Sequence, residues 1–379
     1  MSEVEELLHQ DPKTIMRSII QRIATGPDMS KDISQQEARA GMRAVLDNAV
    51  DPVQAAIFLI ALRMKRETDE ENRGILDAIR DTSVRVTAPV DEVLDLSDPY
   101  NGYNRSLPAA PFVPAVLASC GIQTVSHGVE TMGPKFGITH RRVLRAAGVP
   151  VDLTVEQAAA RLGDSNIGWS YVDQDAYCPQ LHDLNTLRTK IVKRQAITTV
   201  EVLTGPIRGK SKTHFMSGYV HKPYTRVYTM LARHAGFDTA LLVRGIEGGI
   251  IPSLRQKGKM VFYHDLGPEQ EQEFDPADIG IEQAVRATPL PEDLPPRPAG
   301  DDVGADFDVD SAAQQAAEAG LQALGGQPGS TYDALVYSGA IALWHLKRHS
   351  NLVDAAGRIR EVLDNGEALE HFNNATVTD

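Results

Sequence analysis

From Val90 onward, short apolar runs that are typical of strands alternate with helical segments, and this alternation constrains the fold more than any other feature. The strand-like runs are VLDL, IQTVSHG, AITTVEVL, TALLVRG and KMVFYH, and segments such as VEQAAARL and TRVYTMLARHAG between them have helical spacing. Such alternation predicts a largely parallel sheet with helices on both faces. We therefore expect an α/β domain at residues 89–379, with its ligand site in the loops beyond the strand ends.

Residues 1–88 are predicted to form a small, all-helical N-terminal domain. SQQE at Ser34–Glu37 and TDEE at Thr68–Glu71 fit the capping box of a helix start, and Asp51 before Pro52 marks another start. An apolar stripe with helical spacing follows: Val53, Ala56, Ile57, Ile60, Ala61 and Met64. We expect this stripe to serve the core and a subunit interface.

The net charge of −13 is concentrated in one segment. Between Asp265 and Asp310 there are 14 Asp and Glu residues and two Lys and Arg residues, so the rest of the chain is nearly neutral and a local basic surface remains open. We expect residues 267–329 to be an acidic, proline-bearing surface excursion, mobile and dispensable for folding over 267–300, with a helix-compatible interval at 310–326. Two helices are expected after it.

The sequence favours a cytoplasmic protein. It has two cysteines, Cys120 and Cys178, which argues against a disulfide framework. Its acidic N-terminus lacks the pattern of a secretory leader, and no run of 18 apolar residues predicts a membrane span.

Glycines and donor side chains gather in the loops that follow the first predicted strands. The glycines are Gly102, Gly128, Gly133 and Gly137, where backbone N–H groups can approach phosphate oxygens. The donors are Asn104, Ser106, His127, Lys135 and Arg142. The loops therefore favour a phosphate site, although Ser126 and His127 fit a turn cap with a hydrogen-bonded imidazole equally well.

Two basic runs carry no acidic residue. LRTKIVKR ends at Arg194, and RGKSKTHFMSGYVHKPYTR spans residues 208–226 with aromatic side chains at Phe215, Tyr219 and Tyr224. Cations interleaved with aromatic rings suit both anion recognition and contact with nucleic acid.

Other chemistries are not supported. GPIRGKS is one residue short of a P-loop, Ser126 and Cys178 have no identifiable activating base, and no His or Cys spacing fits structural zinc.

The order of several motifs resembles the anthranilate phosphoribosyltransferase family, outside the segment 267–329. AAIFLIALRMKRET lies in the helical region, NRS matches N-x-S, SHG matches K-H-G-N, and LTGPI matches L-G-P-L; VRGIEGG and the closing AGRIREVLDNGEALEHF follow. The resemblance implies a helical domain completed by a segment around 177–194, a homodimer made through its helices, and a magnesium-assisted transfer from phosphoribosyl pyrophosphate.

Residue by residue, the resemblance implies a sugar-phosphate site and an acceptor site. The sugar-phosphate residues would be Asn104, Ser106, His127, Gly128 and Lys135, and Arg188 would hold the acceptor. The chain departs from the family at two places. SDPYNGYN replaces the G-T-G-G-D loop, and Ile250 and Ile251 replace the Asp-Glu pair, which leaves Asp98 and Glu247 as candidate Mg²⁺ ligands.

Two hypotheses follow. The first is a divergent transferase that moves a (phospho)ribosyl group to an aromatic or nitrogenous acceptor. The second is an inactive family member that binds RNA or DNA through Arg208, Lys210, Lys212, Lys222 and Arg226.

Overall fold

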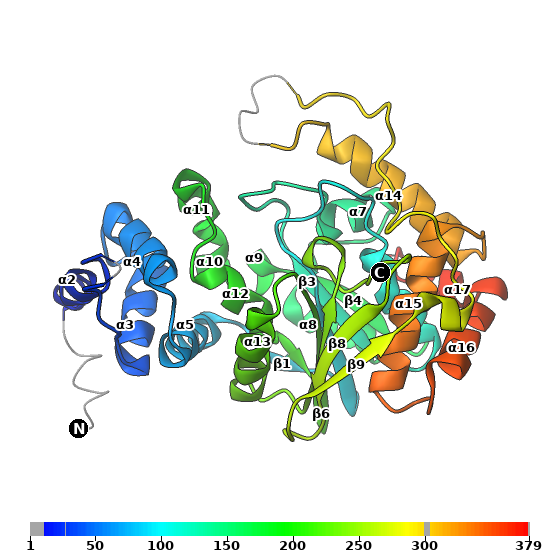
Figure 1. Ribbon diagram of the computed structural model, residues 1–379, viewed down its shortest axis with the longest axis horizontal. Coiled ribbons are helices and arrows are strands. Elements are labelled where there is room, and N and C mark those ends of the chain that lie inside the picture. Colours follow the sequence, from blue (N-terminus) through cyan, green and yellow to red (C-terminus); the bar gives the residue numbers. More distant parts are fainter. Residues whose placement is uncertain (1–10, 27, 299–303, 378–379) are drawn as a thin grey trace.

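The computed structural model describes residues 11–26, 28–298 and 304–377, which form a helical domain beside an α/β domain (Figure 1). The helical domain contains α2 (Pro12–Ile23), α3 (Gln35–Leu46), α4 (Pro52–Lys65) and α5 (Asp69–Thr82). A later stretch lies beside them: α9 (Gln174–Tyr177), α10 (Pro179–Asp183), α11 (Asn185–Ile191) and α12 (Ile197–Val200).

The predicted helix starts in this domain are confirmed. Ser34 and Thr68 each form a complete capping box, with Glu37 and Glu71 as the reciprocal partners. The Asp51 carboxylate accepts a hydrogen bond from the backbone N–H of Val53, and Pro52 occupies the first turn of α4.

The α/β domain is built on a seven-stranded sheet of order β4-β3-β2-β6-β7-β8-β9. Its strands are β2 (Glu92–Ser97), β3 (Thr124–Gly128), β4 (Trp169–Asp173), β6 (Lys212–Tyr219), β7 (Thr239–Arg244), β8 (Gly258–Tyr263) and β9 (Gln270–Phe274). The first five in spatial order are parallel, while β8 and β9 are each antiparallel to the strand before them. A separate two-stranded sheet pairs β1 (Val86–Thr87) with β5 (Ile207–Arg208).

Helices cover both faces of the large sheet, which confirms the predicted fold class (Figure 1). One core contains α6 (Val113–Ser119), α7 (His140–Ala146), α14 (Val309–Leu324), α15 (Ser330–His345), α16 (Leu352–Asp364) and α17 (Glu367–Asn374). The other core joins α8 (Val155–Leu162) and α13 (Pro223–His234) to the helical domain. Short 3-10 turns complete the described fold: η1 (Ala110–Phe112), η2 (Glu201–Leu203), η3 (Ile246–Gly248) and η4 (Pro276–Ile279).

Three local predictions are wrong. AITTVEVL at residues 196–203 forms α12 and η2 rather than a strand, because a short buried apolar run has no period that separates the two. The strands β4 and β6 are not among the predicted ones, and β6 lies inside the second basic run. The C-terminal region contains three helices, α15 to α17, and not two.

The acidic segment also differs from its prediction as a dispensable excursion. Residues 270–274 form the edge strand β9, paired with β8, and Ile279 and Ile281 are buried in the core. Carboxylates of β9 face lysines, including Glu271 opposite Lys222, so their charge does not oppose folding. The expected helix is α14; residues 299–303 lie outside the described part.

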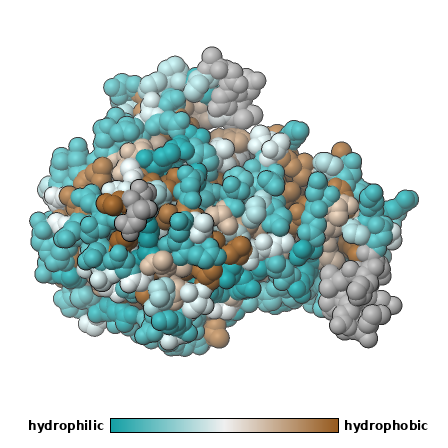
Figure 2. All heavy atoms as spheres, turned by 180° about the vertical axis from the view of Figure 1, so that it is seen from behind, coloured by the Kyte–Doolittle hydropathy of each residue, from teal (hydrophilic) through white to brown (hydrophobic). Residues whose placement is uncertain are grey.

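None of the described helices combines the length and apolar character that crossing a bilayer requires. Figure 2 shows a mainly hydrophilic face with hydrophobic residues scattered among hydrophilic ones. Cytoplasmic location stays a prediction.

Candidate functional site

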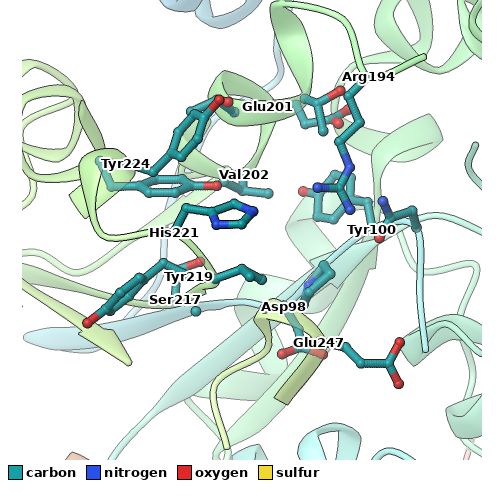
Figure 3. Close-up of a pocket in the computed structure, with 18 of the residues that line it drawn as sticks. Asp98, Tyr100, Arg194, Glu201, Val202, Ser217, Tyr219, His221, Tyr224 and Glu247 are labelled. Carbon is teal, nitrogen blue, oxygen red and sulfur yellow. The ribbon is translucent and has the colours of Figure 1, made fainter. Parts of the chain in front are cut away.

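A pocket of about 360 Å³ lies where the connections of the sheet diverge. From β2 the chain proceeds to β3 and β4 on one side, whereas β6 leads to β7 on the other, so β2 and β6 form the switch point. The loops that leave their carboxyl ends separate there and open a crevice. We call this cavity the switch-point pocket (Figure 3).

Its walls come from both domains. The loop after β2 brings Asp98 to Asn101, and the end of β6 brings Ser217 to His221 before Pro223 starts α13. The turn after β7 adds Glu247 and Gly248. The helical domain contributes Arg63 from α4, and the chain between α11 and α12 contributes Arg194.

Cationic and aromatic side chains face the pocket. Figure 3 shows the Arg194 guanidinium directed toward its centre, and in the described part of the chain this guanidinium has no hydrogen-bond or ion-pair partner. The Arg63 guanidinium lies 5.3 Å from the centroid of the Tyr224 ring, and its Nη1 lies 3.5 Å from Glu67 Oε1. Burial raises the pKa of Tyr228 to about 12, which keeps this phenol neutral at physiological pH.

Two pocket carboxylates are already occupied by donors. Asp98 accepts from the Tyr103 hydroxyl at 2.7 Å and from the Ile250 backbone N–H at 3.0 Å, and His140 Nε2 lies 3.0 Å away. Glu201 accepts two hydrogen bonds of 2.7 Å from the Arg188 guanidinium. Donors of the protein therefore occupy both carboxylates, and Glu201 is in addition paired with a cation.

Glu247 is the third occupied carboxylate. It accepts from the backbone N–H groups of Asn104 at 3.0 Å and Arg105 at 2.9 Å, from Ser106 Oγ at 3.2 Å and from Lys135 Nζ at 3.2 Å. Burial lowers the pKa of Lys135, and the Glu247 charge opposes this effect. The structure thus brings Asn104, Ser106 and Lys135 together as predicted, but around a carboxylate of the same chain. We call these four donors the anion cradle.

The residues do not fit a magnesium ion. No group of three His, Cys, Asp or Glu side chains in the described ranges could hold a metal, and Ile250 and Ile251 are buried. The prediction of Asp98 and Glu247 as metal ligands is corrected, because donors already occupy both carboxylates.

His127 is a core residue and not a ligand donor. Its side chain is 1% exposed, and its Nε2 lies 2.8 Å from Asp95 Oδ1 and 2.9 Å from Ser97 Oγ. The Tyr100 hydroxyl contacts Nδ1 on the other side of the ring. Gly128 is buried at the end of β3. The sugar-phosphate assignment of His127 is therefore corrected, since both ring nitrogens are engaged inside the protein, whereas that of Gly128 stays a prediction.

The Arg188 side chain is likewise buried and cannot contact an acceptor substrate. The side chains of Arg188 and Glu201 are each 1% exposed, and Gln195 Oε1 accepts from Arg188 Nε at 3.2 Å. The guanidinium joins α11 to η2 inside the protein. Its predicted role in acceptor binding is corrected for this reason.

The basic run at 208–226 does not form a free cationic surface. Lys212, Lys222 and Arg226 pair with Asp265, Glu271 and Asp69 at 2.9, 2.9 and 2.7 Å. Lys210 donates to the Pro89 carbonyl, and the Arg208 guanidinium lies 4.2 Å from the Phe237 ring centroid. Four of these five side chains thus have a carboxylate or aromatic partner, and their assignment to nucleic acid stays a prediction that these contacts do not favour.

Four pocket residues, Arg63, Arg194, His221 and Tyr228, are absent from the site that the sequence predicts. Arg194 ends the basic run LRTKIVKR, and that run is a usable signal. Arg63 follows an apolar stripe, and nothing local indicates that the helical domain brings it against the α/β domain.

Comparison with known proteins gives a consistent result. Residues 17–83 match the helical bundle domain of a glycosyl transferase family. An uncharacterized protein of Aquifex aeolicus is 30% identical over 240 residues, which cover 63% of this chain and 71% of that protein. An anthranilate phosphoribosyltransferase of Rhodopseudomonas palustris is 25% identical over 363 residues, covering 93% and 94%.

Solved structures agree in fold. Anthranilate phosphoribosyltransferase from Thermus thermophilus superposes with a TM-score of 0.71 at 17% identity, covering 97% of this chain and 98% of that one. The enzyme from Saccharomyces cerevisiae, solved in complex with PRPP and Mg, gives 0.72 at 14% identity, covering 95% and 97%.

Proposed function

Because the chain belongs to the anthranilate phosphoribosyltransferase family, we propose that it is a divergent transferase that binds a pyrophosphate-activated sugar such as phosphoribosyl pyrophosphate (PRPP) in the switch-point pocket. It transfers the (phospho)ribosyl group to an aromatic or nitrogenous acceptor. The supporting observation is the lining of the pocket: Arg194 and Arg63 face it, Glu201 and Glu247 are paired with Arg188 and Lys135, and Asp98 is hydrogen-bonded to Tyr103 and the Ile250 backbone.

The chemistry requires stabilisation of charge more than a nucleophile from the protein. The ribosyl carbon gains positive charge as the pyrophosphate leaves, and the leaving group gains negative charge. In this proposal Arg194 and Arg63, which line the pocket, stabilise that negative charge. Tyr219 and Tyr224 offer ring faces to a planar acceptor.

Arg194→Ala is expected to weaken PRPP binding by roughly one to two decades, because a charge-assisted hydrogen bond contributes about 1.5–3 kcal/mol. Isothermal titration in EDTA measures the affinity, and release of pyrophosphate with a panel of aromatic amines measures transfer. Arg348→Ala is the matched control, since Arg348 pairs with Glu92 on another surface. Equal affinities of the wild type and Arg194→Ala would count against this site.

A second candidate function is nucleic-acid binding through the first basic run, which ends at Arg194, rather than through the run at 208–226. Lys190 and Lys193 are exposed beside Arg194, and in the described part of the chain neither ammonium has a hydrogen-bond or ion-pair partner. Arg194 lines the pocket together with Tyr224 and Tyr228, and cations near aromatic rings suit a phosphate backbone and stacked bases. An oligonucleotide that binds with steep salt dependence, lost in Lys190→Ala/Lys193→Ala, would favour this function if PRPP gives no binding.

We further propose a homodimer through α4. Val53 and Met64 are 66% and 75% exposed, and the half-buried Ile57 and Ile60 lie between them on the same helix face. Light scattering at micromolar concentration is expected to give twice the chain mass. Val53→Glu/Met64→Glu should yield a folded monomer because it places charge in the interface; Val84→Glu, at an exposed apolar residue after α5, serves as the control. A monomeric wild type contradicts the proposal.

A further inference from the structure

We propose that the Glu247 carboxylate acts as an internal substitute for phosphate, and that a phosphate group of a ligand takes its place in the anion cradle. This inference deepens the proposed function and rests on it for the identity of the ligand. The site itself is defined by the four donors and does not depend on which sugar phosphate the pocket accepts.

The donor set is suited to an oxyanion. Two successive backbone N–H groups, of Asn104 and Arg105, converge with a hydroxyl and an ammonium on the two oxygens of one carboxylate. Backbone N–H and ammonium groups only donate, so they need acceptor atoms, and a phosphate can supply such atoms as a carboxylate does. The donors come from the loops after β2 and β3, and Glu247 comes from the turn after β7.

The backbone at Glu247 is held in an unfavourable conformation. Its φ of +53° lies in the left-handed region, which a residue with a Cβ rarely adopts. The turn cannot easily relax, because a Cβ at Gly245 would lie 1.6 Å from the Gly249 carbonyl oxygen and one at Gly249 would lie 1.7 Å from the Tyr103 hydroxyl. This unfavourable conformation of a non-glycine residue in a tightly packed turn leads to the hypothesis that its side chain has a specific role.

The Glu247 side chain can leave without movement of that turn. Rotation about its own torsions withdraws the carboxylate, while the donors stay on their loops. The side chains of Lys135 and Glu247 are 20% and 8% exposed, so the cradle reaches solvent mainly at the ammonium, and Glu247 and Gly248 also line the switch-point pocket. Figure 3 shows the Glu247 side chain extending away from Tyr219 and His221. An anion in the cradle is therefore adjacent to a ligand in the pocket.

Glu247→Gly tests the proposal directly. This change removes the carboxylate from the cradle. It also relieves the backbone strain, because glycine adopts positive φ without a steric penalty. Orthophosphate and ribose 5-phosphate, titrated separately by calorimetry, are each expected to bind the variant about tenfold more tightly than the wild type, or better. Preference for ribose 5-phosphate identifies a ligand phosphate as the occupant, and equal affinity identifies the free ion; both outcomes support the cradle.

Lys135→Met in the Glu247→Gly background should reverse the gain, because it removes the ammonium donor. If Glu247→Gly does not fold by circular dichroism, Glu247→Gln is measured instead, since a neutral amide should yield to phosphate more readily than a carboxylate. A folded variant that binds both phosphates no better than the wild type overturns the proposal. Glu247 would then have only a structural role, holding the loop after β2 in place.

The two proposals fail in distinguishable ways. Arg194→Ala should leave the gain in orthophosphate binding intact, because Arg194 is not a cradle donor. If PRPP fails to bind the wild type while Glu247→Gly gains orthophosphate affinity, the cradle stands and the transferase function falls. Loss of the gain in Glu247→Gly/Arg194→Ala would contradict the cradle as defined.

Discussion

Replacing Arg188 by methionine is expected to lower the free energy of unfolding by about 3–5 kcal/mol, because it leaves the Glu201 carboxylate as an uncompensated buried charge. Both hydrogen bonds of 2.7 Å between the guanidinium and this carboxylate disappear, and only the 3.2 Å contact from Gln174 remains. Urea denaturation followed by circular dichroism measures the change.

The double variant Arg188→Met/Glu201→Gln should recover much of the loss, since it removes both charges and retains an acceptor for Gln174. The comparison separates a structural arginine from one that binds the acceptor. If Arg188→Met keeps the wild-type stability but abolishes transfer, the role implied by the family resemblance is restored.

The elements that the sequence predicts well are those set by local chemistry. A capping box needs residues only three positions apart, as at Ser34 and Glu37, and the helix starts of the N-terminal domain follow from such pairs. The alternation of strands and helices likewise indicates a parallel sheet without knowledge of the strand order.

The elements that it misses depend on tertiary context. Residues 196–203 are β-branched and apolar but are buried as α12 and η2. The central strand β6 carries Lys212 and His214 near its start, which gives it the pattern of a basic surface. Arg226 and Asp69 are far apart in the sequence yet form an ion pair of 2.7 Å. A run of unpaired charge in a sequence is therefore weak evidence for a charged surface.

The candidate site shows the same limit. Loops after successive parallel strands converge at one edge of a sheet, and this rule alone is enough to group Asn104, Ser106 and Lys135. The position of Glu247 among these donors is set by the turn after β7, which the rule does not describe. The position of Arg194 in the pocket is set by the packing of the chain between α11 and α12, which the rule does not describe either.

His127→Leu is expected to destabilise the protein by about 3–5 kcal/mol, because the substitution leaves a buried carboxylate without its main partner. Asp95 is fully buried, its Oδ1 contacts His127 Nε2 at 2.8 Å, and its Oδ2 has no partner among the described residues. The remaining 3.2 Å hydrogen bond from Ser97 Oγ is too little to solvate a carboxylate. Urea denaturation again provides the measurement.

Asp95→Asn/His127→Leu removes the buried charge and should be markedly more stable than His127→Leu alone. PRPP affinity, measured at a temperature where His127→Leu remains folded, should stay within about twofold of the wild type, because the imidazole is 1% exposed and no ligand atom can reach it. The opposite result, normal stability with a tenfold loss of PRPP affinity, would return His127 to the ligand site that the SHG motif resembles. The expected result places the motif in the sheet core instead, where His127 Nδ1 contacts the Tyr100 hydroxyl, and Tyr177, at 2.7 Å from the same hydroxyl, keeps Tyr100 at the pocket wall when the imidazole is removed.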